Sequence, residues 1–227
     1  PGKAGGLWQE RLVEENGNPV VKPDNGLGCI GCGQCMAVCP CGAITVTGRS
    51  ISPECIFDLP VKEICATPEQ LDNLLEYRRS VREYAKREVE KPKIEKILAM
   101  ASSAPMGIPP SDVGVTVILG HDRVWSFAGD MLDEFQKWLI FGKPWMRMFM
   151  KLFMKKADLE TMRDFIVPIV RELLTARQEK QDLLFYHAPC VLLFHQSPYA
   201  DPIDGHIACT YAMIAAESLG LGTCMIG

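Results

Sequence analysis

Apolar residues recur at helical spacing from Pro68 onward, whereas the chain before this point shows little helical periodicity. Pro68 and Glu69 suit the first turn of a helix. A charged break at Lys91-Pro92 separates two helical faces, which consist of Leu71, Leu74, Leu75 and Val81 and then of Ile94, Ile97, Leu98 and Ala101. We therefore predict two consecutive helices in this part of the chain.

Two later runs have the character of buried strands. Val113 to Leu119 is rich in β-branched residues and is followed by Gly120, and Cys190 to Phe194 is a second apolar run of strand length. Helical segments lie between and after these runs. Residues 68–227 are therefore predicted to form an α+β domain, with a linker around Thr67-Pro68.

The first 66 residues carry turn signals, among them Asn16-Gly17 and Asn25-Gly26. The segments Leu12 to Val21 and Ile44 to Ile51 are predicted to be a pair of short strands. We expect a small separate domain over residues 1–66.

A cysteine run in this domain has the spacing of an iron-sulfur motif. Cys29, Cys32, Cys35 and Cys39, followed by Pro40, reproduce the C-x2-C-x2-C-x3-C-P pattern that holds bacterial [4Fe-4S] clusters. A structural zinc site is the less favoured alternative for such a cysteine cluster. In two-cluster ferredoxins the fourth cysteine ligates the other cluster, so a partner motif is expected downstream.

The partner motif is incomplete, because the same offsets from Cys55 meet Asp58, Val61 and Cys65. In the crossed ligation scheme the intact set predicts one [4Fe-4S] cluster, held by Cys29, Cys32, Cys35 and Cys65. Resemblance to single-cluster ferredoxins implies that Cys39 and Cys55 lie close together as thiols or a disulfide. A second cluster that uses Cys39, Cys55 and the substitute Cys41 stays open.

Composition narrows the class of protein and its surroundings. A chain of 227 residues with 48% hydrophobic content can bury one good core and a small satellite domain, and its net charge of −4 gives no reason to expect nucleic acid. No signal peptide is evident, and half of the ten cysteines lie within residues 29–41, so we expect a soluble protein of a reducing cytoplasm, in an anaerobe. The chain starts at Pro1 and stops at Gly227 in a glycine-rich turn, so we expect a segment to be missing at one or both ends.

Two stretches of the larger domain have candidate chemistry. The run from Arg78 to Arg82 places three guanidiniums and the Ser80 hydroxyl within five residues, which suits a phosphate, although a solvated charged face is the common alternative. Residues 102–112 form a loop rich in proline before the first strand. Such a loop can wrap a planar ligand or simply end a helix.

Together these features resemble the nitroreductase family of FMN enzymes, in its branch with an N-terminal ferredoxin domain. This resemblance implies a mixed or antiparallel central sheet surrounded by helices in a homodimer. The family's R-R-S-x-R-x-[FY] signature assigns FMN binding to Arg78, Arg79, Ser80 and Arg82. Its A-P-[ST]-x-x-N-x-Q loop, which reaches the flavin of the neighbouring subunit, corresponds to Pro105, Met106 and Gly107, but this chain has Pro109 and Ser111 at the asparagine and glutamine positions.

The end of the chain also resembles the family. His206 to Gly227 is similar to the long helix of the dimer core and to the G-L-G turn beneath the isoalloxazine ring. This implies flavin contacts at Cys224, Met225, Ile226 and Gly227. A transmembrane helix is disfavoured there by Glu217 and by many small residues. The family's last strand and final basic residue are absent from the sequence, so the C-terminal part of the domain is expected to be missing.

Residues 126–180 form a helical insertion that is rich in methionine and aromatic residues. The favoured prediction is a lid or dimer contact in which Trp138, Trp145 and Phe149 cover the acceptor side of the flavin. Contact with a membrane surface, through the basic residues of the segment Trp145 to Lys155, is the less favoured alternative.

The predicted function is a flavin-dependent oxidoreductase that passes electrons from the cluster through FMN to a small organic acceptor such as a nitroaromatic or a quinone. A non-catalytic electron-transfer subunit of a larger redox complex is the alternative. No dinucleotide-binding fingerprint is present, and an external ferredoxin or NAD(P)H stays open as donor. No catalytic side chain stands out, since the four histidines are scattered at His121, His187, His195 and His206.

Overall fold

A computed structural model describes residues 12–21, 32–46, 54, 56–107, 112–198 and 200–226. The chain divides into two compact units. The first comprises residues 1–65, 105–113 and 196–205, and the second comprises residues 66–104, 114–195 and 206–227. The first unit thus includes two segments that the sequence assigned to the larger domain, and the expected domain bounds, residues 1–66 and 68–227, stay a prediction.

The first unit begins with a β-hairpin. Strands β1 (Leu12–Glu15) and β2 (Asn18–Val21) pair antiparallel, with Leu12 opposite Val21 and Glu15 opposite Asn18. Asn16 and Gly17 form the two-residue turn with φ of 54° and 80°, the positive values that asparagine and glycine tolerate best. The prediction of one strand over Leu12–Val21 is therefore wrong, because the Asn-Gly turn folds this segment onto itself. Residues 44–46 form no regular element, and residues 47–51 lie outside the described part.

Besides the hairpin, the described residues of this unit include the short helix α1 (Gln34–Ala37) and the 3-10 turn η2 (Lys62–Ile64). Gly33 precedes α1 with φ of 74°, a left-handed conformation that favours glycine. Met36 on α1 is buried. The ferredoxin-like character of this unit stays a prediction.

The second unit starts with helix α2 (Pro68–Tyr77), as the sequence predicted. Thr67 and Gln70 form a capping box: the Thr67 hydroxyl accepts the Gln70 N–H at 3.2 Å, and the Gln70 side chain accepts the Thr67 N–H at 2.9 Å. The helix therefore has its own start signal in sequence. Val81, which the sequence placed on the same helical face, lies beyond the end of α2.

Strands β3 (Val113–Leu119) and β4 (Cys190–Gln196) pair with one another and match both predicted strands. At one end the Gly120 N–H donates to the Pro189 carbonyl at 2.9 Å. At the other end the His195 ring lies against Gly114, so closely that a Cβ at this glycine would meet Cε1 at 2.5 Å. The start of β3 thus lies beside the end of β4, and the strands run antiparallel.

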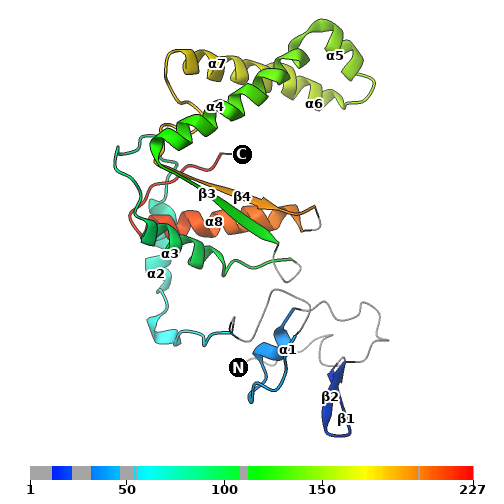
Figure 1. Cartoon of the computed structure of the whole chain (residues 1–227), viewed down its shortest axis with the longest axis vertical. Helices are drawn as coiled ribbons and strands as arrows, with labels where there is room; N and C mark the ends of the chain where they lie inside the picture. The colour runs from blue at the N-terminus through cyan, green and yellow to red at the C-terminus, as the bar shows by residue number, and fades with distance from the viewer. Residues whose placement is uncertain are drawn as a thin grey trace. The chain divides into compact units, whose positions relative to one another are not determined.

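One face of this pair packs against α3 (Lys91–Ala101) and α8 (Pro202–Ser218) (Figure 1). Leu192 and Phe194 of β4 contact the cluster of Ile97 and Ala101 with the alanines of α8. These alanines are buried at Ala212, Ala215 and Ala216. Their small side chains permit a close approach of the helices, so this core is formed around α8.

The other face packs against α4 (His121–Trp138). Val191, which alternates with Leu192 and Phe194 along β4, contacts a second cluster that includes the fully buried Val124. The rest of that cluster comprises Ala128, Leu184 and Phe185, with Ile118 packed against it. The two faces of the strand pair therefore serve two cores.

The helical insertion continues from α4 as the sequence predicted. Its further elements are the 3-10 turn η3 (Leu139–Gly142), α5 (Pro144–Met150), α6 (Lys156–Thr161), the π-helix η4 (Met162–Ile166) and α7 (Val167–Gln178). Arg177 joins α7 to α4, because its Nη1 donates to the Gly129 carbonyl at 3.0 Å and to Asp133 Oδ1 at 2.8 Å. The lid role of this insertion stays a prediction.

Two findings concern the surroundings expected for the protein. None of the described helices, α8 included, is long and apolar enough to cross a membrane. Eight cysteines in the described part of the chain are free thiols: Cys32, Cys35, Cys39, Cys41, Cys65, Cys190, Cys209 and Cys224.

Candidate functional site

The arginine run lies where α2 ends. Arg78 is the C-cap of the helix, with ψ of 124°, so the chain leaves the helix in an extended conformation. The Arg79 guanidinium folds back, and its Nη1 donates to the carbonyls of Glu76 and Arg78. A cation that binds the last carbonyls of a helix stabilises its C-terminal end. Arg79 therefore helps to fix the direction in which Ser80, Val81 and the next residues leave the helix.

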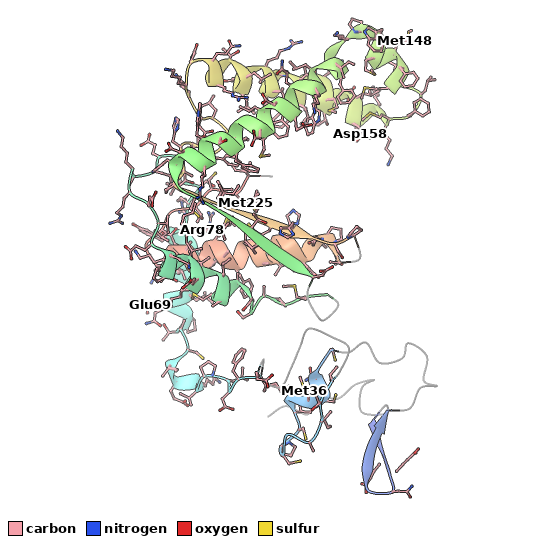
Figure 2. The ribbon with its side chains drawn as sticks, in the orientation of Figure 1. Met36, Glu69, Arg78, Met148, Asp158 and Met225 are labelled. Carbon is pink, nitrogen blue, oxygen red and sulfur yellow. The ribbon has the colours of Figure 1, made fainter. Side chains whose placement is uncertain are left out.

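The segment after Arg79 pairs with the glycine-rich turn at the end of the chain. Ser80 forms a parallel bridge with Thr223, and the Val81 N–H donates to the Thr223 carbonyl at 2.9 Å. Figure 2 shows Arg78 and Met225 on these two segments. Two segments that lie about 140 residues apart in sequence are thus adjacent in the fold.

The pairing depends on Gly222, because a Cβ at this position would lie 2.5 Å from Val81 Cγ2 and 2.9 Å from Val81 Cβ. Gly220, with φ of 71°, makes the preceding turn. The two glycines therefore have different tasks. Gly220 provides a left-handed backbone, and Gly222 permits the close approach of two chain segments.

The hydroxyl of Thr223 has an unusual environment. Its Oγ1 is buried and has no hydrogen-bond partner among the residues that the structure describes. A buried hydroxyl without a partner is unfavourable by about 1–3 kcal/mol. A polar ligand at the junction of the two segments would supply the missing hydrogen bond, so the residues present fit a bound group here.

Tyr84 and Cys224 add two titratable groups to the same junction. The pKa of Tyr84 is raised to about 12, mainly by burial and to a smaller extent by the neighbouring Cys224 and Tyr186, while Arg82 acts in the opposite direction. The phenol is therefore neutral at ordinary pH and can donate a hydrogen bond. The signature position that the sequence resemblance left without a role thus contributes a half-buried, protonated side chain.

Tyr186 is a site residue that sequence reasoning missed. The guanidinium of Arg82 lies over its ring, with Cζ 5.8 Å from the ring centroid. Tyr186 and His187 have φ of 56° and 54°, which is uncommon for residues other than glycine, asparagine and aspartate. A tertiary contact of this kind leaves no local pattern in the sequence. The signal that marks Tyr186, its positive φ, is visible only in the structure.

Asp182 holds the backbone of this turn. Its carboxylate is buried, and it accepts the N–H groups of Leu184 at 3.0 Å, Phe185 at 2.9 Å and His187 at 3.1 Å. The Asp182 N–H in turn donates to His187 Nε2 at 3.2 Å. Three charge-assisted hydrogen bonds to one carboxylate fix the position from which Tyr186 meets Arg82.

The proline-rich loop belongs to the first unit. The Gly107 N–H donates to Asp204 Oδ1 at 2.9 Å, and Asp204 is buried. This carboxylate therefore anchors the end of the Pro105–Met106–Gly107 segment to the start of α8. Pro109 and Ser111 lie outside the described residues, as does Gly227.

The predicted cluster ligands are described only in part. Cys29 and Cys55 lie outside the described residues, and Cys32 and Cys35 are half-buried. Within the described ranges no group of three or more side chains is arranged to hold a metal ion. Cys39 instead lies beside Cys41, with 3.7 Å between the sulfurs.

The Cys39 thiol is the most polarised of these groups. The Ala43 N–H donates to its sulfur at 3.3 Å and is the largest cause that lowers the pKa of Cys39. Donors near a cysteine sulfur favour the thiolate, which is the form that binds metals. Cys65 is exposed. Val61, which stands where the partner motif would have a cysteine, is exposed as well.

The histidines have structural contacts, as the sequence led us to expect. His195 Nε2 lies 3.2 Å from Thr116 Oγ1, across the strand pair. His121 Nδ1 lies 3.0 Å from the His187 carbonyl, and the His187 ring stacks on Trp125 with 5.7 Å between centroids.

A comparison with known protein families matches residues 75–227 to the nitroreductase family. The chain belongs to the nitroreductase family. No curated protein matches it. Similar solved structures include an FMN-dependent nitroreductase from Clostridium difficile R20291, with 23% identity over 71% of this chain and a TM-score of 0.49. Another is a nitroreductase with bound FMN from Bacteroides fragilis NCTC 9343, with 19% identity over 68% of each chain and a TM-score of 0.47. The chain spans 62% of the first of these structures.

Membership in the nitroreductase family confirms the family predicted for the C-terminal part and agrees with an oxidoreductase of α+β fold. The matched region starts at Leu75, directly before the arginine run, and contains all the residues of the junction. The N-terminal ferredoxin character lies outside this match and stays a prediction, as do the FMN contacts of individual residues.

Proposed function

We propose that this nitroreductase-family protein is an FMN-dependent oxidoreductase that reduces a small organic acceptor. The observation that carries this proposal is the pairing of Ser80 and Val81 with Thr223. It joins the two segments to which the family resemblance assigns the flavin. It also leaves the Thr223 hydroxyl buried without a partner among the described residues, and a polar group of a bound flavin would supply that hydrogen bond.

In this proposal Arg78 and Arg82 hold the phosphate of FMN. Guanidinium forks match phosphate geometry and form charge-assisted hydrogen bonds. The Arg79 guanidinium is already bound to helix carbonyls, so its task is to orient the segment. Tyr186 lies against Arg82 and limits the positions that this side chain can adopt.

The other junction residues suit the uncharged parts of the cofactor. Thr223 Oγ1 supplies a hydroxyl without a partner, and Tyr84 supplies a phenol that stays protonated at ordinary pH. Gly222 keeps the backbone free of side-chain atoms at the junction. When bound, FMN accepts two electrons and passes them on as a hydride or singly. The protein positions the cofactor and supplies the surrounding charge.

We further propose that the cysteine motif binds one [4Fe-4S] cluster through Cys29, Cys32, Cys35 and Cys65. Support comes from the motif spacing, since the cysteines lie at the offsets of a bacterial [4Fe-4S] motif. Cys39 and Cys55 are left as thiols or as ligands of a second cluster. The cluster would supply electrons, alone or beside an external ferredoxin or NAD(P)H.

A homodimer in a reducing cytoplasm is part of the same proposal, because the family resemblance implies that the flavin lies between subunits. The acceptor class comprises nitroaromatics, quinones and similar small organic molecules. The competing proposal of a non-catalytic electron-transfer subunit draws on the same cysteine motif.

The FMN assignment is tested with Arg78→Ala/Arg82→Ala. Each arginine contributes about 1.5–3 kcal/mol through hydrogen bonds to a charged group, so we expect FMN binding to weaken by a factor of about a hundred or more. Flavin retention after gel filtration and the flavin absorption spectrum provide the measurement. Arg123→Ala on α4, where the arginine is exposed, is the matched control. Full retention of FMN in the double variant contradicts the assignment.

The cluster and the catalytic role are tested separately. Iron and sulfide analysis of anaerobically purified protein should give about four of each per chain, and Cys65→Ala should lose them while Cys190→Ala does not. Iron near eight per chain would indicate two clusters. Turnover of a nitroaromatic or a quinone by the isolated, reduced protein supports the enzyme, and its absence with both cofactors present supports the electron-transfer subunit.

A further inference from the structure

The segment Lys143–Lys156, here called the α5 segment, has an unusual charge. It carries the basic residues Lys143, Arg147, Lys151, Lys155 and Lys156 and no acidic residue. The whole chain has a net charge of −4, so the other residues together carry −9. A concentrated positive charge on an otherwise acidic protein directs this segment toward an anionic partner.

The same segment exposes a stripe of large apolar side chains. Trp145 is 56% exposed, and Met148 is 72% exposed and lies at the outer edge of α5 (Figure 2). The stripe continues through Phe149, Leu152 and Phe153, which are 56%, 75% and 76% exposed. Their spacing of three and four residues puts them on one helical face. An amphipathic helix normally turns this face to the protein core, so here it is available to a partner.

The stripe is held as one surface. After α5 ends, the N–H groups of Leu152 and Phe153 donate to the carbonyls of Phe149 and Met150 at 3.1 and 3.0 Å, so the helical path continues. The rings of Phe149 and Phe153 lie 5.3 Å apart. Met150, which is 7% exposed, anchors the opposite side. Lys143, Lys151, Lys155 and Lys156 are exposed around the stripe.

We propose that the α5 segment binds the surface of an anionic lipid bilayer. Aromatic and aliphatic side chains that enter the boundary of the acyl region, with lysines among the headgroups, are the features of helices that lie in the membrane interface. None of the described helices can cross a bilayer, so this contact is peripheral. The sequence alone favoured a lid or dimer contact, and the exposure of the whole stripe inside a basic segment shifts the balance.

A second α5 segment fits the surface less well. A symmetric contact between two α5 segments would put five basic residues of one chain against the same five of the other. Like charges opposed across an interface are strongly unfavourable. Self-association through this segment is therefore an outcome that the experiment must distinguish.

The test uses the full chain and vesicles of phosphatidylcholine with and without phosphatidylglycerol. We expect sedimentation with the anionic vesicles only, weakened by NaCl, together with a blue shift of the Trp145 fluorescence that Trp145→Phe removes. Equal binding to both kinds of vesicle, or to neither, overturns the proposal. Since the binding does not involve the flavin, its failure leaves the oxidoreductase proposal untouched.

Two pairs of variants locate the contact. Lys151→Gln/Lys155→Gln should weaken binding roughly 25-fold, about fivefold for each charge near the surface. Phe149→Ser/Phe153→Ser should weaken it roughly tenfold or more for each ring removed from the interface. The matched controls are Lys96→Gln on α3 and Phe165→Ser on η4, which are exposed outside the α5 segment. If the Phe149/Phe153 variant loses self-association in sedimentation velocity and keeps vesicle binding, the surface joins two copies and the proposal is wrong.

Discussion

Replacement of Asp182 by alanine tests whether one carboxylate holds the turn that carries Tyr186. The change removes the acceptor of three backbone N–H groups, two of which belong to the buried residues Leu184 and Phe185. A hydrogen bond to a charged group contributes about 1.5–3 kcal/mol, and water can replace the bond at the exposed His187. We therefore expect Asp182→Ala to lower the free energy of unfolding by about 3–5 kcal/mol.

The conservative variant separates the hydrogen bonds from the packing. Asp182→Asn keeps an oxygen that can accept from Leu184 and Phe185, but its amide group cannot accept from His187. The expected loss is about 1.5–2 kcal/mol, close to that of one bond to a charged acceptor. Asp130→Ala, on the exposed face of α4, should change the stability by no more than about 0.5 kcal/mol.

Urea denaturation followed by circular dichroism gives the unfolding free energies, and flavin absorption gives FMN affinity at temperatures where each variant is folded. Because Tyr186 lies beside Arg82, the alanine variant should also bind FMN more weakly than Asp130→Ala does. A loss below about 1 kcal/mol for Asp182→Ala, or equal losses for the alanine and asparagine variants, would refute the reasoning.

Three further outcomes follow from single features of the second unit. Gly222→Ala should weaken FMN binding about tenfold or more, because its Cβ would meet Val81. Gly220→Ala has open space for its Cβ but a φ of 71°, so it should cost about 1 kcal/mol of stability and keep the FMN affinity. Equal FMN affinity of the two variants would contradict this. Val124→Ala should lower stability by about 2 kcal/mol in urea denaturation, since this side chain is fully buried between α4 and the strand pair, and a loss under about 0.5 kcal/mol would argue against that core. Burial raises the pKa of Cys190 from 9.0 to about 11, so this thiol ionises at lower pH in the unfolded chain than in the folded chain. The free energy of unfolding should therefore fall as the pH rises from 9 to 11. Cys190→Ala should reduce this fall, and an unchanged pH profile would contradict it.

The regular elements were the part of the fold that local sequence could predict. The strand Val113–Leu119 was predicted with its observed bounds, because a β-branched run between turn residues has few other conformations open to it. The helix at Pro68 was predicted from its first turn, and the capping box of Thr67 and Gln70 explains why that signal is reliable. These elements are specified by neighbours within a few residues.

At the hairpin of Asn16-Gly17 the turn signal was recognised in the sequence, but the strand was predicted to run through it. The whole segment Leu12–Val21 was treated as one strand. An Asn-Gly pair between two short apolar runs favours pairing of the adjacent runs, since loop closure over two residues fixes the register.

The candidate site was predictable where it depends on motifs and not where it depends on tertiary contacts. The resemblance to nitroreductases predicted both segments of the junction, and the structure brings Ser80 and Thr223 together. Tyr186 and Asp182 lie in a turn without a motif, and their roles depend on where that turn meets Arg82. The sequence predicted an amphipathic helix, apolar nearly all round, from Trp145 to Met154, whereas α5 ends at Met150. Sequence cannot tell apolar side chains that turn inward from those that are left in solvent.

The contact of Arg177 with Gly129 and Asp133 joins α7 to α4, so the part of the insertion between these helices can be replaced as one piece. The two bonds close the base of the insertion on α4 and α7, so residues 139–166 form a loop whose ends are held whatever the loop contains. The entropy of closing such a loop changes slowly with its length. Evolution can therefore lengthen, shorten or recharge this tip without rebuilding the strand pair beneath it. Exchange of residues 139–166 with those of another family member is therefore expected to change this surface and to leave the pairing of Ser80 with Thr223 as it is.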